Sequence, residues 1–300
     1  MTTAHPPTLL TPRVLIPFII VTLIWGSTWI VIRDQLGSVP PSWSVTYRFA
    51  VAAIGMFILT AFRREPLLLR GRAWGFAALL GALQFALNFN FVYRAESYVT
   101  SGVVAIIFAL LIVPNTLLSR LFLKTSFDRR FLMGSAIALA GIAFLLVHEA
   151  RSVRGDAMAV LLGFALTFSG VMSASFGNIM QASRFARAQP AATILAWAIL
   201  FGSVADGLFA TLTVGAPTID MRPAYLAGVA YLGIIGTVCT FPLYFRIVRD
   251  VGAGPAAWSS VLIPIVAMTL STLGEGYSWS PLAISGAVLA IAGLIVALRR

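Results

Sequence analysis

The chain has 300 residues, of which 59% are hydrophobic and 10% are charged, and it carries a net charge of +11 at pH 7. A water-soluble fold of this length could not bury so much apolar surface and still present a polar exterior to water. Composition therefore excludes an ordinary soluble domain and indicates a polytopic membrane protein.

Ten apolar stretches fill the chain almost from end to end. Each is long enough to cross a bilayer as a helix, which takes about 20 residues. The runs are continuous rather than alternating, which excludes the strands of a β-barrel. The predicted fold is an all-α integral membrane protein with ten transmembrane helices. The predicted spans are 14–32, 43–62, 73–92, 99–121, 130–147, 157–180, 190–213, 223–245, 253–273 and 281–298.

The basic residues are distributed unevenly between the two sides of these spans. With the N-terminus in the cytoplasm, 15 of the 21 Lys and Arg residues fall in cytoplasmic segments, 5 fall outside, and Arg48 lies within a span. The positive-inside rule then predicts a multi-pass protein of the inner (plasma) membrane with both termini cytoplasmic. The positive charge faces anionic lipid headgroups of the bilayer, and no nucleic-acid partner is expected.

The sequence predicts no catalytic, metal-binding or cofactor-binding residues. It contains no HExxH, GxSxG or GxxxxGK[ST] motif and no paired carboxylates within a span. The single cysteine, Cys239, lies inside the eighth predicted span and forms neither an intramolecular disulfide nor a cysteine-based metal site. We do not expect an enzyme, although an intramembrane enzyme and a lipid-binding structural protein stay open as alternatives.

The two halves of the chain resemble each other at an offset near 150 residues. Residues 1–150 and 151–300 each hold five predicted spans. An odd number of spans makes the second half enter the membrane from the opposite side. The prediction is therefore a pair of inverted five-helix repeats, an arrangement that recurs in secondary transporters. The matched positions are Pro40 with Pro190, Gly102 with Gly252, Pro114 with Pro264, and Gly134–Gly141 with Gly286–Gly293.

Several local signatures occur in a characteristic order along these spans. They are Trp25-Gly26-Ser27-Thr28 in the first span, Tyr47-Arg48-Phe49 in the second, and the Ala/Gly-rich segments at 134–141 and 286–293. With five-plus-five spans, the chain resembles the drug/metabolite transporter superfamily of the EamA type. Within it, the chain is most similar to the bacterial aromatic amino-acid exporters. The resemblance implies export of small amphipathic metabolites, above all aromatic and other neutral amino acids.

Polar residues inside the spans form stripes that are costly in hydrocarbon unless they face protein or water. We expect these stripes to line a central pocket for a small-molecule substrate, formed by spans one, three and six with four, eight and nine. The alternative is that they act as interhelical glue, which we favour for Ser169 and Ser173. The candidate substrate-binding residues are Trp25, Thr28, Gln84, Asn88, Ser175, Asn178 and Trp258.

Proline and glycine mark spans four and nine as the moving elements. Pro114 and Pro264 are expected to interrupt these helices at equivalent points, because proline lacks the backbone N–H and clashes with the carbonyl four residues back. Gly102 and Gly252 add flexibility near the start of the same spans. These four residues are the predicted hinges of alternating access.

Two charged residues lie within spans at matching depths, Arg48 in the second and Asp206 in the seventh. We expect them either to pair or to reach outward to the membrane surface. Proton coupling normally needs a titratable group in the pathway, and Asp206 is the only carboxylate well inside a span. This favours facilitative transport, with a proton-coupled exporter of drugs or other metabolites as the alternative.

Overall fold

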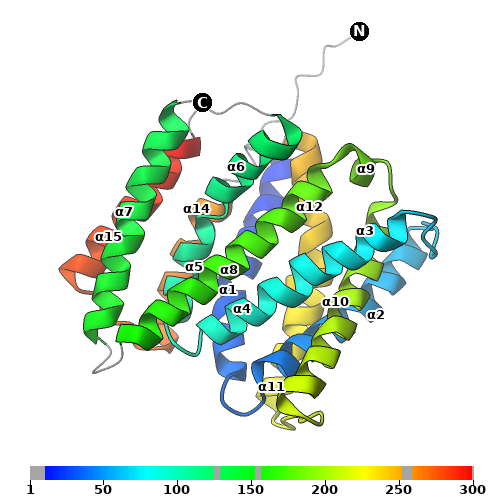
Figure 1. Ribbon diagram of the computed structural model, residues 1–300, viewed down its shortest axis with the longest axis horizontal. Coiled ribbons are helices and arrows are strands. Elements are labelled where there is room, and N and C mark those ends of the chain that lie inside the picture. Colours follow the sequence, from blue (N-terminus) through cyan, green and yellow to red (C-terminus); the bar gives the residue numbers. More distant parts are fainter. Residues whose placement is uncertain (1–10, 125–128, 153–156, 252–258, 299–300) are drawn as a thin grey trace.

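A computed structural model describes residues 11–124, 129–152, 157–251 and 259–298, and within them all regular structure is helical (Figure 1). Long helices run side by side and are joined by short connections. Two segments, η1 and η2, are π-helical and lie in the middle of longer helical runs. The first half contains α1 (Pro12–Gln35), α2 (Pro41–Phe62), α3 (Ala73–Leu80), η1 (Gly81–Leu87), α4 (Asn88–Ala95), α5 (Ser101–Ala109), α6 (Ile112–Leu123) and α7 (Arg129–Ser152). The second contains α8 (Ala157–Ala182), α9 (Arg184–Arg187), α10 (Ala191–Val214), α11 (Pro223–Ala230), η2 (Tyr231–Cys239), α12 (Thr240–Val251), α14 (Ser259–Gly274) and α15 (Pro281–Leu298).

Eight described helical runs are long and apolar enough to cross a membrane, and they coincide with the first eight predicted spans to within a few residues. Two shorter apolar helices, Leu262–Gly274 and Pro281–Gly293, lie in the ninth and tenth predicted spans. The exterior of the bundle is apolar, as lipid contact requires. Phe62, Leu212 and Leu273, for example, are between 79% and 85% exposed.

The third and eighth spans each change from α-helix to π-helix and back. In one span, η1 lies between α3 and α4, and in the other, η2 lies between α11 and α12. In η2 the Thr237 hydroxyl donates to the carbonyl of Leu232, five residues back, at 2.8 Å. π-Helical turns of this kind are rare and occur frequently at functional sites.

The predicted interruption by proline holds for one of the two spans. The fourth span breaks at Leu110 and Leu111, between α5 and α6, and Leu110 is the residue whose carbonyl Pro114 would strike. In the ninth span α14 continues through Pro264, so the expectation of equivalent interruptions is wrong there. Loss of one hydrogen bond can be absorbed by a bend in a continuous helix. Gly252 lies outside the described residues.

Several helix pairs approach so closely that only glycine fits between them. A Cβ on Gly141 would lie 2.5 Å from the Gly286 carbonyl oxygen, and one on Gly293 would lie 2.5 Å from that of Gly134. These contacts join α7 and α15, which lie side by side at one edge of the bundle (Figure 1). Gly102 serves the same purpose between α5 and α14, since its Cβ would lie 2.5 Å from Met268 Sδ.

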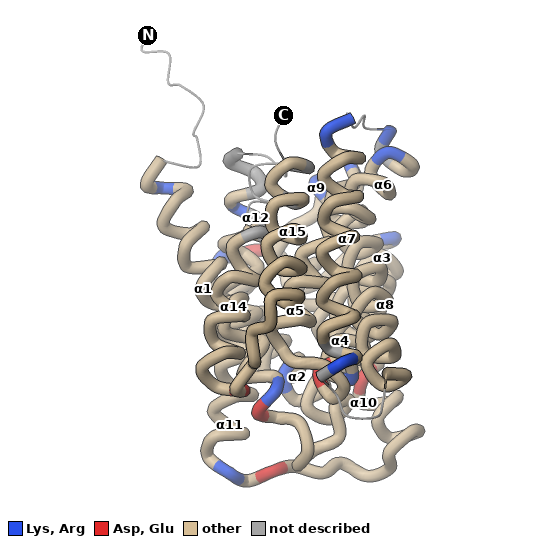
Figure 2. The backbone as a smooth tube through the Cα atoms, turned by 90° about the vertical axis from the view of Figure 1, so that its left-hand side faces the viewer, with Lys and Arg blue, Asp and Glu red and all other residues tan. Residues whose placement is uncertain are grey.

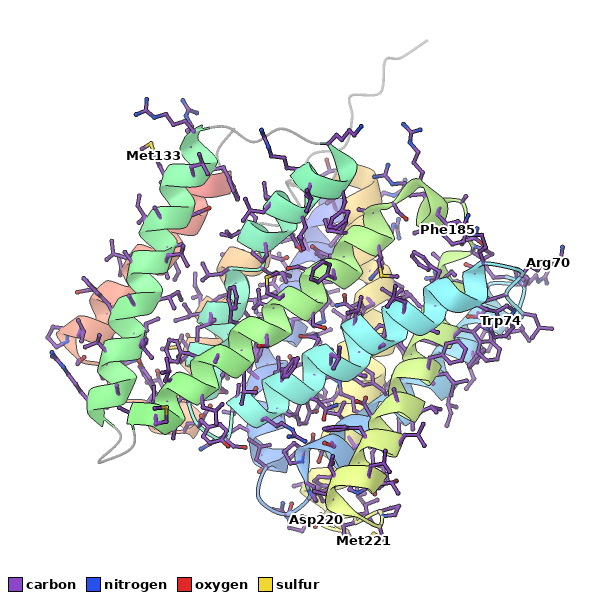
Figure 3. The ribbon with its side chains drawn as sticks, in the orientation of Figure 1. Arg70, Trp74, Met133, Phe185, Asp220 and Met221 are labelled. Carbon is purple, nitrogen blue, oxygen red and sulfur yellow. The ribbon has the colours of Figure 1, made fainter. Side chains whose placement is uncertain are left out.

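Charged residues gather at the two ends of the bundle and are sparse between them (Figure 2). The end that holds α6 and α9 carries Lys and Arg, and the end that holds α11 carries both signs together. Figure 3 places Arg70, Trp74 and Phe185 toward one end and Asp220 and Met221 at the other. We call the end with Asp220 the mixed-charge end and the end with Arg70 the basic end.

Candidate functional site

Trp25 and Thr28, predicted to share a polar stripe on the first span, both lie against η2. The Trp25 indole N–H donates to the carbonyl of Gly236 at 3.3 Å. Its ring also packs against Phe241 and Tyr244, with centroids 5.4 and 5.0 Å away. Thr28 is buried and donates to the Trp25 carbonyl within its own helix at 2.7 Å. The stripe therefore marks a contact between α1 and the π-helical turn.

The amide pair on the third span faces α8. A Cβ on Gly177 would lie 2.3 Å from Gln84 Oε1, and one on Gly170 would lie 3.4 Å from Asn88 Oδ1. Both amides are buried and both of these oxygens lack a hydrogen-bond partner. Ser173 on α8 donates to the Leu83 carbonyl at 2.8 Å, which is the interhelical bond expected of glue.

The remaining candidates are more dispersed. Ser175 is fully buried and donates to the Val171 carbonyl of its own helix at 2.8 Å, so its hydroxyl is already used. Asn178 is half-buried on α8. Ser169 is half-buried, and its hydroxyl bonds within its own helix to the Ala165 carbonyl at 2.9 Å rather than to another helix. Trp258 lies outside the described residues.

Asp206 is fully buried on α10, and a relay of hydrogen bonds satisfies one of its carboxylate oxygens. Asn90 donates to Asp206 Oδ1 at 2.5 Å, and Ser42 donates to Asn90 Oδ1 at 2.8 Å. Arg94 in turn donates to Ser42 Oγ at 3.2 Å. The relay thus leads from Arg94 of α4 through Ser42 of α2 and Asn90 to the carboxylate.

Arg48 neither pairs with Asp206 nor reaches the surface of the protein, so both expectations for it are wrong. The residue is 2% exposed, and no carboxylate of the described residues lies within 4 Å of it. Its guanidinium lies over the ring of Phe89, 4.4 Å from the centroid, and 5.3 Å from that of Phe49. The aromatic residues of α2 and α4 therefore hold it inside the bundle.

The interactions that Arg48 makes offset only part of the free energy that its burial costs. A cation over an aromatic face gains about 0.5–2 kcal/mol, whereas burying an unpaired ion costs several kcal/mol. Two guanidinium nitrogens, Nε and Nη1, have no hydrogen-bond partner. Uncompensated charge at membrane depth is the usual mark of a functional position.

A second polar cluster lies at the mixed-charge end of the bundle, where four helices meet. Arg33 at the end of α1 donates to the Glu96 carbonyl and lies 3.8 Å from the Glu275 carboxylate, which follows α14. Glu275 accepts hydrogen bonds from the backbone N–H and the hydroxyl of Ser101, the first residue of α5. We call Arg33, Glu96, Ser101 and Glu275 the end cluster.

The carboxyl group of Glu96 is the unusual member of the end cluster. It lies one residue beyond α4, is fully buried, and neither of its oxygens has a hydrogen-bond partner. Burial, and next the negative charge of Glu275, raise the pKa of Glu96 well above its usual value of 4.5. Glu96 therefore holds its proton at pH values where an exposed glutamate is already ionised.

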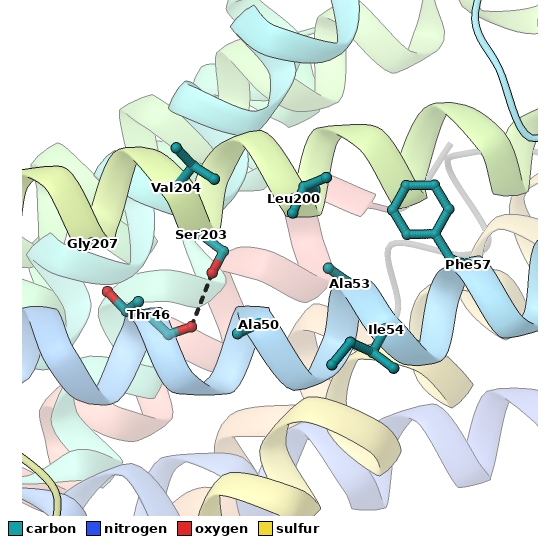
Figure 4. A pocket seen from close by; sticks show the side chains of 9 residues that line it. All are labelled: Thr46, Ala50, Ala53, Ile54, Phe57, Leu200, Ser203, Val204 and Gly207. Carbon is teal, nitrogen blue, oxygen red and sulfur yellow. Dashed lines mark hydrogen bonds between the residues drawn. The ribbon is translucent and has the colours of Figure 1, made fainter.

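The structure contains a pocket of about 570 Å³ between α2 and α10, which is not the predicted central pocket (Figure 4). Its walls are nearly all apolar, and its one internal polar contact is the Ser203 hydroxyl donating to the Thr46 carbonyl at 3.0 Å. The lining residues Ile54 and Val204 are strongly exposed on the outside of the bundle. An apolar recess on this outer surface suits a lipid chain rather than a polar metabolite.

Sequence reasoning missed Asn90, Gln35 and Glu96. Asn90 carried a signal, because it lies two residues after Asn88 in an apolar span and an amide there needs a partner. Gln35 and Glu96 lie at span ends, where polar residues are common, so their full burial could not be seen in the sequence. Among the described residues, no three His, Cys, Asp or Glu side chains come together that could hold a metal ion.

Comparison with known proteins assigns the chain to a protein family. The sequence pattern of the EamA-like transporter family matches it twice, at residues 13–147 and 157–299. A protein of Escherichia coli K12 named uncharacterized inner membrane transporter YedA is 30% identical over 261 residues, which is 83% of this chain and 79% of the relative.

Two further similarities extend over more of the chain. A protein of Salmonella typhimurium named probable amino-acid metabolite efflux pump is 26% identical, over 93% of this chain and 92% of the relative. A solved crystal structure with 18% identity superposes with a TM-score of 0.67, over 94% of this chain and 95% of that one, and shows the same fold. The chain therefore belongs to the EamA-like transporter family of membrane proteins.

Proposed function

We propose that the protein exports aromatic and other neutral amino acids, or closely related amphipathic metabolites, across the inner membrane. The observation that carries this proposal is the similarity, over 93% of the chain, to proteins named probable amino-acid metabolite efflux pumps in Salmonella typhimurium and Escherichia coli. The interior supports it, because aromatic rings and unsatisfied polar groups occur side by side there. An amino acid with an apolar side chain and a charged head matches such surroundings.

The proposed mechanism is alternating access between two inverted repeats, residues 1–150 and 151–300. Three observations support the repeat. The family pattern matches the chain twice. The π-helical segments begin at Gly81 and Tyr231, which are 150 residues apart. The glycine contacts between α7 and α15 are reciprocal, Gly141 with Gly286 and Gly134 with Gly293, as across a two-fold axis.

We further propose that both termini and the basic end face the cytoplasm, in accordance with the positive-inside rule. The pathway then runs between α1, the third span, α8 and η2, past Trp25, Thr28, Gln84 and Asn88. The closed end cluster would separate this pathway from the outside. Trp258, Ser175 and Asn178 remain candidate contacts, and Gly102, Pro114, Gly252 and Pro264 remain candidate hinges.

The test is uptake of labelled phenylalanine by liposomes that contain the purified protein, with and without a pH gradient. Saturable flux that is independent of the gradient and is inhibited by other neutral amino acids is the expected result. Asn88→Ala should abolish flux while membrane insertion stays normal. Absence of flux for aromatic and aliphatic amino acids from folded protein would refute the proposed substrate class.

A proton-coupled exporter is the second candidate function, and Glu96 is the observation that favours it. A buried carboxyl group with a raised pKa can exchange a proton as the end cluster opens and closes. In the same liposomes this mechanism requires flux that appears only with the gradient and that Glu96→Gln uncouples.

A further inference from the structure

Hydrogen-bond donors without partners are concentrated around Arg48. The guanidinium offers Nε and Nη1, and the buried side chain of Gln35 offers Nε2. Gln35 joins this group through Tyr93, whose hydroxyl donates to Gln35 Oε1 at 3.2 Å and lies beside Arg48. The three unsatisfied atoms are all N–H donors. A molecule that satisfies them must therefore bring acceptors, and next to a guanidinium it is best negatively charged.

The donors lie next to the π-helical turn that the first-span stripe contacts. Arg48 Nη2 is 3.8 Å, and Thr28 Cγ2 is 3.1 Å, from the point where a Cβ of Gly236 would be. Trp25 donates to the carbonyl of the same glycine at 3.3 Å. Arg48 thus meets the polar stripe of α1 at η2, which connects it to the proposed pathway.

No carboxylate of the described residues forms an ion pair with Arg48, although Glu96 is near enough for the two charges to act on each other. Asp206, which the sequence suggested as the ion-pair partner of Arg48, is instead hydrogen-bonded to Asn90, and the chain of hydrogen bonds continues through Ser42 to Arg94. Within the part of the chain that the structure describes, no carboxylate lies within 4 Å of Arg48. A stable internal ion pair is therefore not the reason why this arginine is buried.

We propose that Arg48, with the Gln35 amide that Tyr93 orients, binds the carboxylate of the transported substrate, while the rings of Phe49 and Phe89 contact the apolar part of the substrate. This inference rests on the proposed function and specifies the chemistry of its substrate. The planar guanidinium matches a carboxylate through two parallel hydrogen bonds. Its aromatic neighbours suit an apolar chain or ring next to that carboxylate.

The charge balance favours a carboxylate over a phosphate monoester. One guanidinium neutralises the single negative charge of a carboxylate, whereas a phosphate monoester carries nearly two charges near neutral pH. The chain has a single lysine, Lys124, and it lies in a connector at the end of α6. The substrate class is thus an organic monocarboxylate with an apolar body, such as a neutral amino acid or its 2-oxo acid.

The test is direct binding to the purified full-length protein, followed by thermal shift and by tryptophan fluorescence. The probes are phenylalanine, leucine and phenylpyruvate, with phenylalaninamide, leucinamide and phenyl phosphate beside them. The wild type should bind the acids at least about tenfold more tightly than the amides. Arg48→Lys, which keeps the charge but loses the two parallel N–H donors of the guanidinium, should remove most of this preference for acids over amides.

Arg94→Gln is the matched control, since Arg94 also lies over an aromatic ring, 5.2 Å from that of Phe209, but has a hydrogen-bond partner in Ser42. It should keep the preference for acids. Equal binding of acid and amide, an unchanged preference in Arg48→Lys, tighter binding of phenyl phosphate, or no binding of any acid by folded wild type would each overturn the proposal.

Flux measured in parallel separates this inference from the proposed function. Binding that prefers acids without any flux would refute transport of these compounds and leave the carboxylate site standing. Flux of phenylalaninamide equal to that of phenylalanine would refute the carboxylate site and leave transport standing. Size-exclusion profiles of Arg48→Lys and Arg48→Gln identify any variant that fails to fold.

Discussion

At the scale of single residues, Asp206 depends on Asn90. Because Asn90 donates to this buried carboxyl group at 2.5 Å, Asn90→Leu would leave the group without its partner. We expect Asn90→Leu to destabilise the protein by about 1–3 kcal/mol, and the double variant Asn90→Leu/Asp206→Leu to recover most of the loss, since an apolar pair leaves no buried polar group unsatisfied. Thermal unfolding in detergent measures both effects. Equal losses in the single and the double variant would contradict the relay.

Unfolding temperatures also test whether Asp206 and Arg48 interact. Because these two residues do not pair, exchanging their charges in one protein should give no recovery relative to Arg48→Asp alone. Recovery by the exchange, measured as restored unfolding temperature, would show that the two side chains interact after all.

Glu65 stabilises the start of α10 from the connector that follows α2. Its Oε2 accepts hydrogen bonds from the backbone N–H groups of Ala192 at 3.0 Å and Thr193 at 3.4 Å. These are first-turn amides without partners in their own helix. We expect Glu65→Ala to cost about 1 kcal/mol and Glu65→Gln less, because the amide keeps an acceptor and loses only the charge. Unfolding temperatures of the two variants should fall in that order; the reverse order would contradict capping.

At the scale of elements, α7 and α15 are held together by backbone contact. A Cβ on Gly141 would lie 2.4 Å from the Ala290 backbone nitrogen, an atom that cannot move without the helix. Gly141→Ala should therefore destabilise the protein by about 1–3 kcal/mol. Gly75 on α3 is the control, because nothing lies within 4 Å of its Cβ position. Gly75→Ala should stabilise by about 0.5–1 kcal/mol. Equal shifts in unfolding temperature would refute the packing argument.

The sequence predicted the spans well because span length and hydropathy are set by the bilayer. It predicted the break in the fourth span from Pro114, but the same rule failed in the ninth span, where α14 continues through Pro264. It did not predict η1 or η2, whose residues differ little from those of ordinary apolar helices. Nor could it show that Arg48 and Asp206 have different neighbours, since matching depth says nothing about which helix faces which.

The candidate site shows the same division between local and tertiary information. Periodicity grouped Trp25 with Thr28 and Gln84 with Asn88, and each pair does contact one neighbouring element. Which element it contacts, η2 or α8, follows only from packing. A stripe of polar residues therefore indicates that a helix face is buried. Whether that face holds two helices together or lines a transport pathway depends on the element that packs against it.

At the scale of the whole molecule, the end cluster ties α1, α4, α5 and α14 together, and its strength should depend on pH. Because the pKa of Glu96 is raised in the folded protein, the folded state holds a proton that the unfolded chain releases above its usual value of 4.5. Stability should then fall as the pH rises above 4.5 and through the raised pKa of the folded state. The cause is that an ionised Glu96 is buried without hydrogen bonds beside the negative charge of Glu275, which the positive charges of Arg33 and Arg48 offset only in part.

Glu96→Gln imitates the protonated acid and should make the unfolding temperature nearly independent of pH in this range. Glu275→Gln removes the charge that Glu96 meets, and also the Arg33 ion pair. The Glu275→Gln variant should therefore weaken the contacts of the end cluster. It should reduce the pH dependence of the unfolding temperature only in part, because burial is the first cause of the raised pKa of Glu96. If wild type and Glu96→Gln lose stability equally with rising pH, another group controls this end of the molecule. If only the wild type does, one carboxyl group makes the stability of the end where these four helices meet depend on pH.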